Sequence, residues 1–224
     1  PMAVVEGVRL SKAYRIGGRA VTVLDEVNVQ VAQGEWVVVA GESGSGKTTL
    51  LSLLSGLDRP SAGRVVIDGR DITALSENDL APLRNGTIGF VFQSFHLIPA
   101  LTALENVMFP AELRGDGDSR QRARQLLERV GLDHRAGNMP NQLSGGEQQR
   151  VAVCRALINE PKVIFADEPT GNLDSANSQE IITLLREIRS ERQTALIMAT
   201  HSHELAAKAD RVVAIKDGRL NEAA

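Results

Sequence analysis

The chain has 224 residues, of which 42% are hydrophobic and 24% charged, and its net charge is −3. This length fits one large domain, and the composition is that of a globular protein and excludes general disorder. The negative net charge argues against a protein that coats nucleic acid, because such proteins carry an excess of basic residues.

Short β-rich stretches separated by turn residues are predicted from Val4 to Ile67. Among them are Val27 to Val31, Trp36 to Ala40 and Val65 to Ile67. Trp36 to Ala40 is a continuous apolar run that leads into a glycine-rich loop, as expected of a strand buried on both faces of a parallel sheet. A helix from about Lys47 to Ser55 is predicted to follow the loop.

The loop itself, Gly41-Glu-Ser-Gly-Ser-Gly-Lys-Thr48, matches the phosphate-binding pattern G-x-x-x-x-G-K-[ST]. Its backbone N–H groups are expected to bind phosphate at a helix N-terminus, while Lys47 reaches the β- and γ-phosphates and Thr48 ligates Mg²⁺. Chance alone would produce the four fixed positions in about one such chain in a hundred. The candidate nucleotide-binding residues here are Gly41, Glu42, Ser43, Gly44, Ser45, Gly46, Lys47, Thr48 and Thr49.

The rest of the chain is predicted to alternate helix and strand around a helical insertion at about 95–160. Before and within the insertion we expect a strand at Ile88 to Val91, helix and loop from Leu101 to Asn141, and a helix from Ser119 to Val130. After these we expect a helix from Gly145 to Ile158, a strand at Val163 to Ala166, a helix with Ile181, Ile182, Leu184, Leu185 and Ile188 on one stripe, a strand at Ala195 to Ala199, a helix near His203 to Ala209, and a strand at Arg211 to Ile215.

Two of these predicted strands end in polar side chains suited to phosphate chemistry. Asp167 and Glu168 follow the strand that starts at Val163. Asp167 is placed to hold Mg²⁺, and Glu168 can act as a general base on the attacking water. His201 follows the next strand and could donate a hydrogen bond to the γ-phosphate, although a histidine at a strand end is more often structural.

Leu143-Ser-Gly-Gly-Glu-Gln-Gln-Arg150 resembles the signature sequence of ATP-binding-cassette (ABC) proteins. Ser144 and the N–H groups of Gly145 and Gly146 would open a helix as a second anion-binding site. In that family this site faces the γ-phosphate held by the partner subunit.

Other family elements follow in order. Tyr14 is similar to the aromatic residue that stacks on adenine, and Gln93 is similar to the glutamine that touches Mg²⁺ and the attacking water. Asn172-Leu-Asp174 resembles the loop that crosses the dimer interface, and His201 resembles the switch histidine. The resemblance implies a P-loop NTPase of the α/β class: one ABC nucleotide-binding domain over residues 1–224, with a mostly parallel sheet, an antiparallel β subdomain and a helical subdomain.

Three further stretches resemble the lipoprotein-release and macrolide-export ATPases, most closely their YbbA-like branch. They are Gly89 to Pro99, Leu101 to Val107 and Ala166 to Asp174. This kinship implies an ATPase that pairs with a second copy of itself and drives an integral membrane permease subunit in export or lipoprotein extraction. It also implies a peripheral location on the cytoplasmic face of the bacterial inner membrane, with ATP and Mg²⁺ as cofactors.

The longest apolar runs are far below the roughly 18 residues that span a bilayer, so a membrane role would come from a partner. The half-apolar segment with Phe95, Leu97, Ile98 and Leu101 could grip that partner or simply pack in the core. Cys154 is expected to be a small buried residue in a reducing compartment. Two other functions stay open at this point: an ABC ATPase not coupled to transport, and a nucleotide-gated scaffold that does not hydrolyse ATP.

Overall fold

A six-stranded, mostly parallel sheet forms the centre of the protein in a computed structural model that describes residues 3–222. The strand order is β10-β9-β3-β8-β7-β6, and only β10 runs antiparallel to its neighbour. The strands are β3 (Trp36–Ala40), β6 (Ile88–Phe92), β7 (Val163–Asp167), β8 (Ala195–Ala199), β9 (Arg211–Lys216) and β10 (Arg219–Glu222). The carboxyl ends of β3, β8, β7 and β6 therefore meet along one edge of the sheet.

The apolar sequence of β3 explains its central position. Because side chains alternate across a strand, Val37 and Val39 face one side of the sheet, while Trp36 and Val38 face the other. All four are buried, so both faces of the sheet are covered. The prediction of a strand with two buried faces is confirmed.

A second, antiparallel sheet of four strands packs beside the first, in the order β2-β1-β4-β5. Its strands are β1 (Ala3–Ile16), β2 (Arg19–Ala32), β4 (Ala62–Ile67) and β5 (Arg70–Asp71). Helix α1 (Lys47–Leu54) shares a hydrophobic core with this sheet and with one face of the parallel sheet. The predicted short stretch at Val27 to Val31 is wrong in length, because pairing with β1 extends the strand back to Arg19.

Most helices occupy the residue ranges that the hydrophobic periodicity of the sequence predicts. They are α2 (Glu77–Thr87), α3 (Ala103–Glu112), α4 (Ser119–Arg129), α5 (Gly145–Leu157), α6 (Ser175–Arg192) and α7 (His203–Ala206), with 3-10 turns η1 (Asp133–Arg135) and η2 (Pro140–Gln142). Helix α2 was not predicted, because Pro82 and Gly86 interrupt its pattern, yet Ser76 caps it. The predicted helix to Ala209 ends at Ala206 instead.

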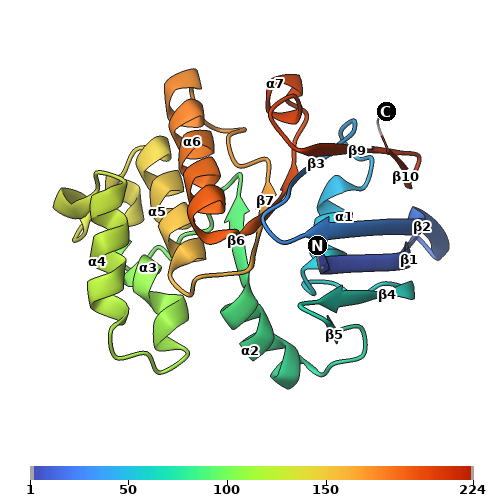
Figure 1. Ribbon diagram of the computed structural model, residues 1–224, viewed down its shortest axis with the longest axis horizontal. Coiled ribbons are helices and arrows are strands. Elements are labelled where there is room, and N and C mark those ends of the chain that lie inside the picture. The colour runs from blue at the N-terminus through green and yellow to red at the C-terminus, as the bar shows by residue number, and fades with distance from the viewer. Residues whose placement is uncertain (1–2, 223–224) are drawn as a thin grey trace.

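Helices α3, α4 and α5 form a region of their own at one end of the molecule, opposite the antiparallel sheet (Figure 1). Their shared core includes Leu127, Val151 and Cys154. Cys154 is fully buried, which confirms the expectation of a small buried residue, and this burial raises the pKa of its thiol to about 12. In residues 3–222, no helix has both the length and the apolar character that a membrane span requires.

Candidate active site

The loop between β3 and α1 has the conformation of a phosphate cradle. Gly46 lies at φ 105° as the N-cap of α1, in a left-handed region that favours glycine. A Cβ there would also lie 3.2 Å from the carbonyl oxygen of Val23. Both the backbone conformation and the close carbonyl oxygen therefore favour glycine at this position.

Two polar groups of this loop are poised for an anion. Lys47 is 9% exposed, and its Nζ donates to the carbonyl oxygens of Gly41 and Glu42 at 2.8 and 3.0 Å. Ser45 Oγ is buried and has no hydrogen-bond partner within residues 3–222. Because a buried hydroxyl without a partner costs free energy, a phosphate oxygen at the helix N-terminus would be a stabilising acceptor.

The two predicted carboxylates stand at the end of β7, next to the end of β8. Glu168 adopts φ 45°, and its Oε1 lies 2.9 Å from Nδ1 of His201. Burial raises the pKa of Asp167, and the nearby Glu168 charge raises it further, while a Thr48 hydrogen bond and Lys47 oppose the shift. The structure thus brings both acids, the histidine and the phosphate loop together.

The residues around Asp167 fit a magnesium ion. A hydroxyl and a carboxylate are the oxygen ligands that Mg²⁺ prefers, and Thr48 and Asp167 are hydrogen-bonded to each other. In the described part of the chain, no group of three or more His, Cys, Asp or Glu side chains could hold a metal ion. This donor set suits Mg²⁺, which takes one or two protein ligands together with phosphates and water.

Gln93 follows β6, whose last residue, Phe92, pairs in register with Asp167. Its Nε2 donates to Oδ1 of Asn172 at 3.1 Å, and Asn172 Nδ2 donates back to the Gln93 carbonyl oxygen at 3.1 Å. A Cβ on Gly171 would come within 2.6 Å of the Gln93 amide. Gln93 therefore lies beside the acids, held by the loop that follows them.

The predicted signature residues lie at the start of α5. Ser144 caps this helix by accepting from the Glu147 backbone N–H, and the Glu147 carboxylate accepts from the Ser144 N–H at 2.7 Å. A Cβ on Gly146 would fall 1.9 Å from Oδ1 of Asn177, so this glycine lets α5 lie against α6. Asp174 caps α6 by accepting from the Asn177 N–H at 2.8 Å. Ser144 and Asp174 thus each use their side chains to cap the helix that they precede.

Tyr14 lies on β1 and is 37% exposed. Its hydroxyl donates to Oδ2 of Asp58 at 2.9 Å, and Thr49, in the first turn of α1, also hydrogen-bonds it. Burial raises the pKa of Tyr14, and Asp58 adds to this effect. The ring therefore lies at the rim of the phosphate loop, with one face under Lys12 Nζ at 4.9 Å.

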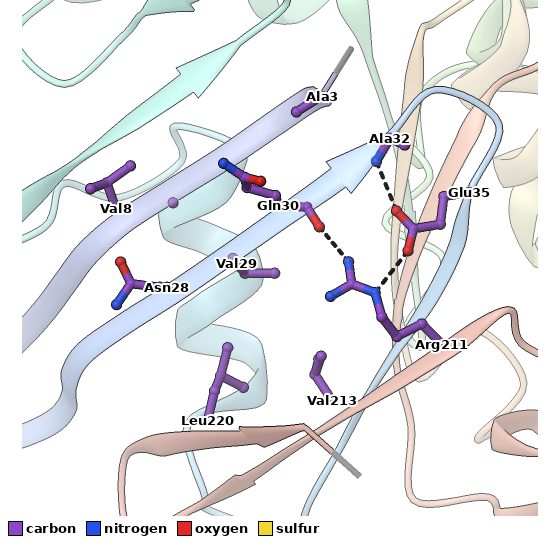
Figure 2. A pocket seen from close by; sticks show the side chains of 11 residues that line it. Ala3, Val8, Asn28, Val29, Gln30, Ala32, Glu35, Arg211, Val213 and Leu220 are labelled. Carbon is purple, nitrogen blue, oxygen red and sulfur yellow. Dashed lines mark hydrogen bonds and ion pairs between the residues drawn. The ribbon is translucent and has the colours of Figure 1, made fainter. Parts of the chain in front are cut away.

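The cavity of about 680 Å³ in Figure 2 lies elsewhere, between the two sheets. Arg211, which lines this cavity, donates to Glu35 Oε1 at 2.8 Å and to the Gln30 carbonyl oxygen (Figure 2). Its lining comes from the strands of both sheets and includes no residue of the phosphate loop. Cavity size therefore does not identify the site of chemistry here.

The sequence pattern does not indicate the contacts of two polar residues around the site. Asn172 stands in the predicted interface loop, and in the structure it pairs with Gln93. In the sequence Gln149 is one residue of the signature, whereas in the structure it is fully buried and donates to the carbonyl oxygens of Phe92, the last residue of β6, and of Pro169, two residues after β7. The signal for Gln149 was available, since it interrupts the apolar stripe of α5 four residues before Val153.

Comparison with known proteins gives a consistent result. A family model described as ABC transporter matches residues 24–171. The macrolide export ATP-binding/permease protein MacB of Rhodopirellula baltica is 49% identical over 217 residues, which is 95% of this chain and 32% of that protein. The lipoprotein-releasing system ATP-binding protein LolD of Xanthomonas campestris pv. campestris is 47% identical over 224 residues, 99% of this chain and 94% of that protein.

The chain thus spans about a third of the length of its MacB relatives, and nearly all of the LolD relatives' length. Among solved structures, a dimer of the ATP-binding cassette MJ0796 in a post-hydrolysis state, bound to ADP and Pi, has a TM-score of 0.91. It is 40% identical, and the match covers 97% of each chain.

Proposed function

This chain belongs to the ABC transporter family as an ATP-binding and ATP-hydrolysing subunit, and from that premise we propose that two copies close head to tail over two ATP molecules. In this arrangement Ser144 and Gly146 of each copy complete the site of the other. The capping box at Ser144 supports the proposal, because it fixes the start of α5, where the N–H groups of Gly145 and Gly146 have no acceptor within the helix and can bind an anion.

The phosphate loop of each copy binds the triphosphate of its own ATP. The backbone N–H groups from Gly41 to Thr49 and the orphaned Ser45 hydroxyl surround the phosphates, while Lys47 turns from its two carbonyl acceptors to the β- and γ-phosphates. Tyr14 offers its ring to adenine at the rim of this loop.

Glu168 accepts a proton from the water that attacks the γ-phosphate in line, and Gln93 orients the same water. His201, 2.9 Å from Glu168, donates a hydrogen bond to the γ-phosphate as charge grows on it. Magnesium, held by Thr48 and Asp167, supplies positive charge to the phosphates when bound. Loss of the γ-phosphate then removes the bridge between the copies, and the dimer opens.

The contact between Glu168 and His201, beside Asp167 and the phosphate loop, is the observation that carries this function. Its test is Glu168→Gln, which keeps the side-chain shape and removes the base. We expect ATP binding to persist, turnover to fall about 10²- to 10⁴-fold, and a stable ATP-bound dimer to accumulate in size-exclusion chromatography. Turnover equal to that of the parent chain would refute the assignment of the base.

A groove of about 400 Å³ beside β6 is proposed as the contact for a membrane subunit. It lies between α2 and α3 and is lined by Ala81, Arg84, Asn85, Ile88, Gly89, Phe90, Phe92, His96, Phe109, Pro110, Leu113, Arg155, Ala156 and Asn159. Phe109 and Leu113, one helical turn apart, are 38% and 68% exposed, so two large apolar side chains stand together on the wall of this groove. Arg155 donates to the Phe95 and His96 carbonyl oxygens, so this groove is continuous with the segment after Gln93.

The proposed contact with the membrane subunit is therefore this groove, in place of part of the segment predicted from Phe95 to Leu101. Leu97 packs against the core of α3, α4 and α5, which favours core packing for that residue. The names of the relatives point to macrolide export or lipoprotein release as the work that is driven. On that basis we place the chain at the cytoplasmic face of the inner membrane, bound to an integral membrane subunit.

A further inference from the structure

Gln149 joins three parts of the proposed hydrolysis site. It lies one turn into α5 and is fully buried. Its Nε2 donates to the carbonyl oxygen of Phe92 at 3.2 Å and also to that of Pro169. Phe92 directly precedes Gln93, and Pro169 directly follows Glu168, so one amide group touches the chain next to both residues that handle the attacking water.

The two acceptors belong to neighbouring strand ends. Strands β6 and β7 are parallel, with Phe92 opposite Asp167. This pair is the last in the register of the two strands, and both strands end with it. The Gln149 amide bridges the two backbones at that point and ties them to the helix that begins after Ser144.

Glu168 needs such a restraint. Its φ of 45° is a conformation that a residue with a side chain rarely adopts, and it persists only where the surroundings hold it. The Glu168 N–H donates to the Ala199 carbonyl oxygen at 2.9 Å on one side, and the Gly171 N–H donates to the Glu168 carbonyl oxygen at 3.0 Å on the other. The bond from Gln149 to Pro169 holds the next peptide along.

The buried side-chain amide of Gln149 costs free energy that an apolar side chain of the same size would not cost. Both of its N–H hydrogens are used, but Gln149 Oε1 is buried without a partner in residues 3–222. A methionine would fill nearly the same space without burying this oxygen. The polar group is therefore suited to the bridge rather than to filling the core.

We propose that Gln149 is a positioning residue of ATP hydrolysis, which couples the anion site at Ser144 to Gln93 and Glu168 of the same copy. The proposal rests on the head-to-tail function above. In that dimer Ser144 contacts the ATP of the partner, whereas Gln93 and Glu168 act on the ATP of their own copy. Through Gln149, binding or hydrolysis of the partner's ATP at Ser144 can therefore shift Gln93 and Glu168, which act on the copy's own ATP.

The test is Gln149→Met, which keeps volume and removes both donors. We expect kcat to fall roughly ten- to hundredfold, because small displacements of positioned groups have effects of this size, while KM for ATP stays within about twofold. Gln149→Asn keeps an amide that is one methylene shorter and reaches at most one of the two carbonyls. Its kcat should therefore lie between that of the Gln149→Met variant and that of the parent chain.

The matched control is Thr194→Val. Thr194 is 3% exposed, and its Oγ1 donates to the Pro161 carbonyl oxygen at 3.2 Å at the opposite edge of the sheet. This exchange also orphans a buried carbonyl, so it should lower Tm to a similar extent and leave kcat unchanged. Equal kcat in the parent, Gln149→Asn and Gln149→Met chains would overturn the proposal, and so would a fall in kcat that Thr194→Val shares.

These outcomes are distinct from failure of the proposed function. If Glu168→Gln is inactive while Gln149→Met turns over ATP at the parent rate, only the role of Gln149 fails. If Glu168→Gln itself turns over ATP at the parent rate, the proposed function fails first. In the Glu168→Gln background, Gln149→Met should still form the ATP-bound dimer, because the bridge positions the water-handling residues and leaves the phosphate loop intact.

Discussion

His201 Nδ1 lies 2.9 Å from Glu168 Oε1, although the two residues are 33 positions apart in the chain. They meet because β7 and β8 are parallel neighbours, which places their carboxyl ends side by side. The Glu168 side chain is 18% exposed and that of His201 76% exposed, so the acid is set back in the site and the imidazole reaches outward. This arrangement suits a base that handles water and a histidine that meets the γ-phosphate.

The first prediction concerns that histidine. His201→Ala should reduce kcat about 10²- to 10³-fold, because it removes a donor to the charge that develops on the γ-phosphate. The measurement is steady-state release of phosphate at saturating ATP. His203→Ala is the control, since His203 is also exposed but begins α7, outside the proposed site. An equal effect of both exchanges would contradict the role of His201.

A second prediction follows from the buried carboxylate. Burial raises the pKa of Asp167, so its ionised form costs stability at neutral pH, and this cost disappears as pH falls below the ordinary range of an aspartate. Asp167→Asn should therefore raise the Tm of the nucleotide-free chain at neutral pH and abolish most of the ATP turnover.

The raised pKa of Asp167 also predicts how the change in Tm caused by Asp167→Asn depends on pH. The gain in Tm from Asp167→Asn should shrink as pH is lowered, because protonation neutralises Asp167 in the parent chain as well. Thermal unfolding of both chains across a pH series measures the difference. A gain that grows toward acid pH would contradict the raised pKa.

The groove yields a third prediction. Leu113→Asp should weaken retention of the chain by the membrane subunit, because it puts a charge into an apolar contact, and it should leave the ATPase rate of the isolated chain unchanged. Leu57→Asp is the matched control, since Leu57 is 50% exposed and does not line the groove. Co-purification from membranes after detergent extraction measures retention, and equal retention of both variants would count against the groove.

The phosphate loop and the strand ends could be predicted because their signals are local. The apolar run at Trp36 to Ala40 and the glycine pattern after it fix a strand, a turn and a helix within a few residues. The carboxyl-end positions of Asp167 and His201 then follow from the parallel alternation of helix and strand.

The features that the sequence does not predict depend on contacts between segments that are far apart in the chain. The 14-residue length of β2 comes from pairing with β1, because its first four residues are exposed and make no contribution to the core that would mark them as a strand. Helix α2 carries Pro82, and its stability comes from the Ser76 cap and from Leu80 in the core. The bond from Gln149 to Phe92 joins residues 57 positions apart, and neither the composition nor the periodicity of either segment indicates the partner.

The central claim, that each active site is shared between two copies, is tested most directly by mixing two inactive variants. Ser144→Asp keeps a good cap on α5 but places a negative charge where the partner's phosphate would bind. Glu168→Gln lacks the base but keeps an intact Ser144. A mixed dimer therefore contains one complete site, made from Glu168 of the first chain and Ser144 of the second.

The two purified chains are combined before ATP is added, and phosphate release is compared with that of each chain alone at the same total concentration. We predict that the mixture hydrolyses ATP faster than either variant by itself. A mixture that never exceeds the faster of the two variants would contradict the shared site.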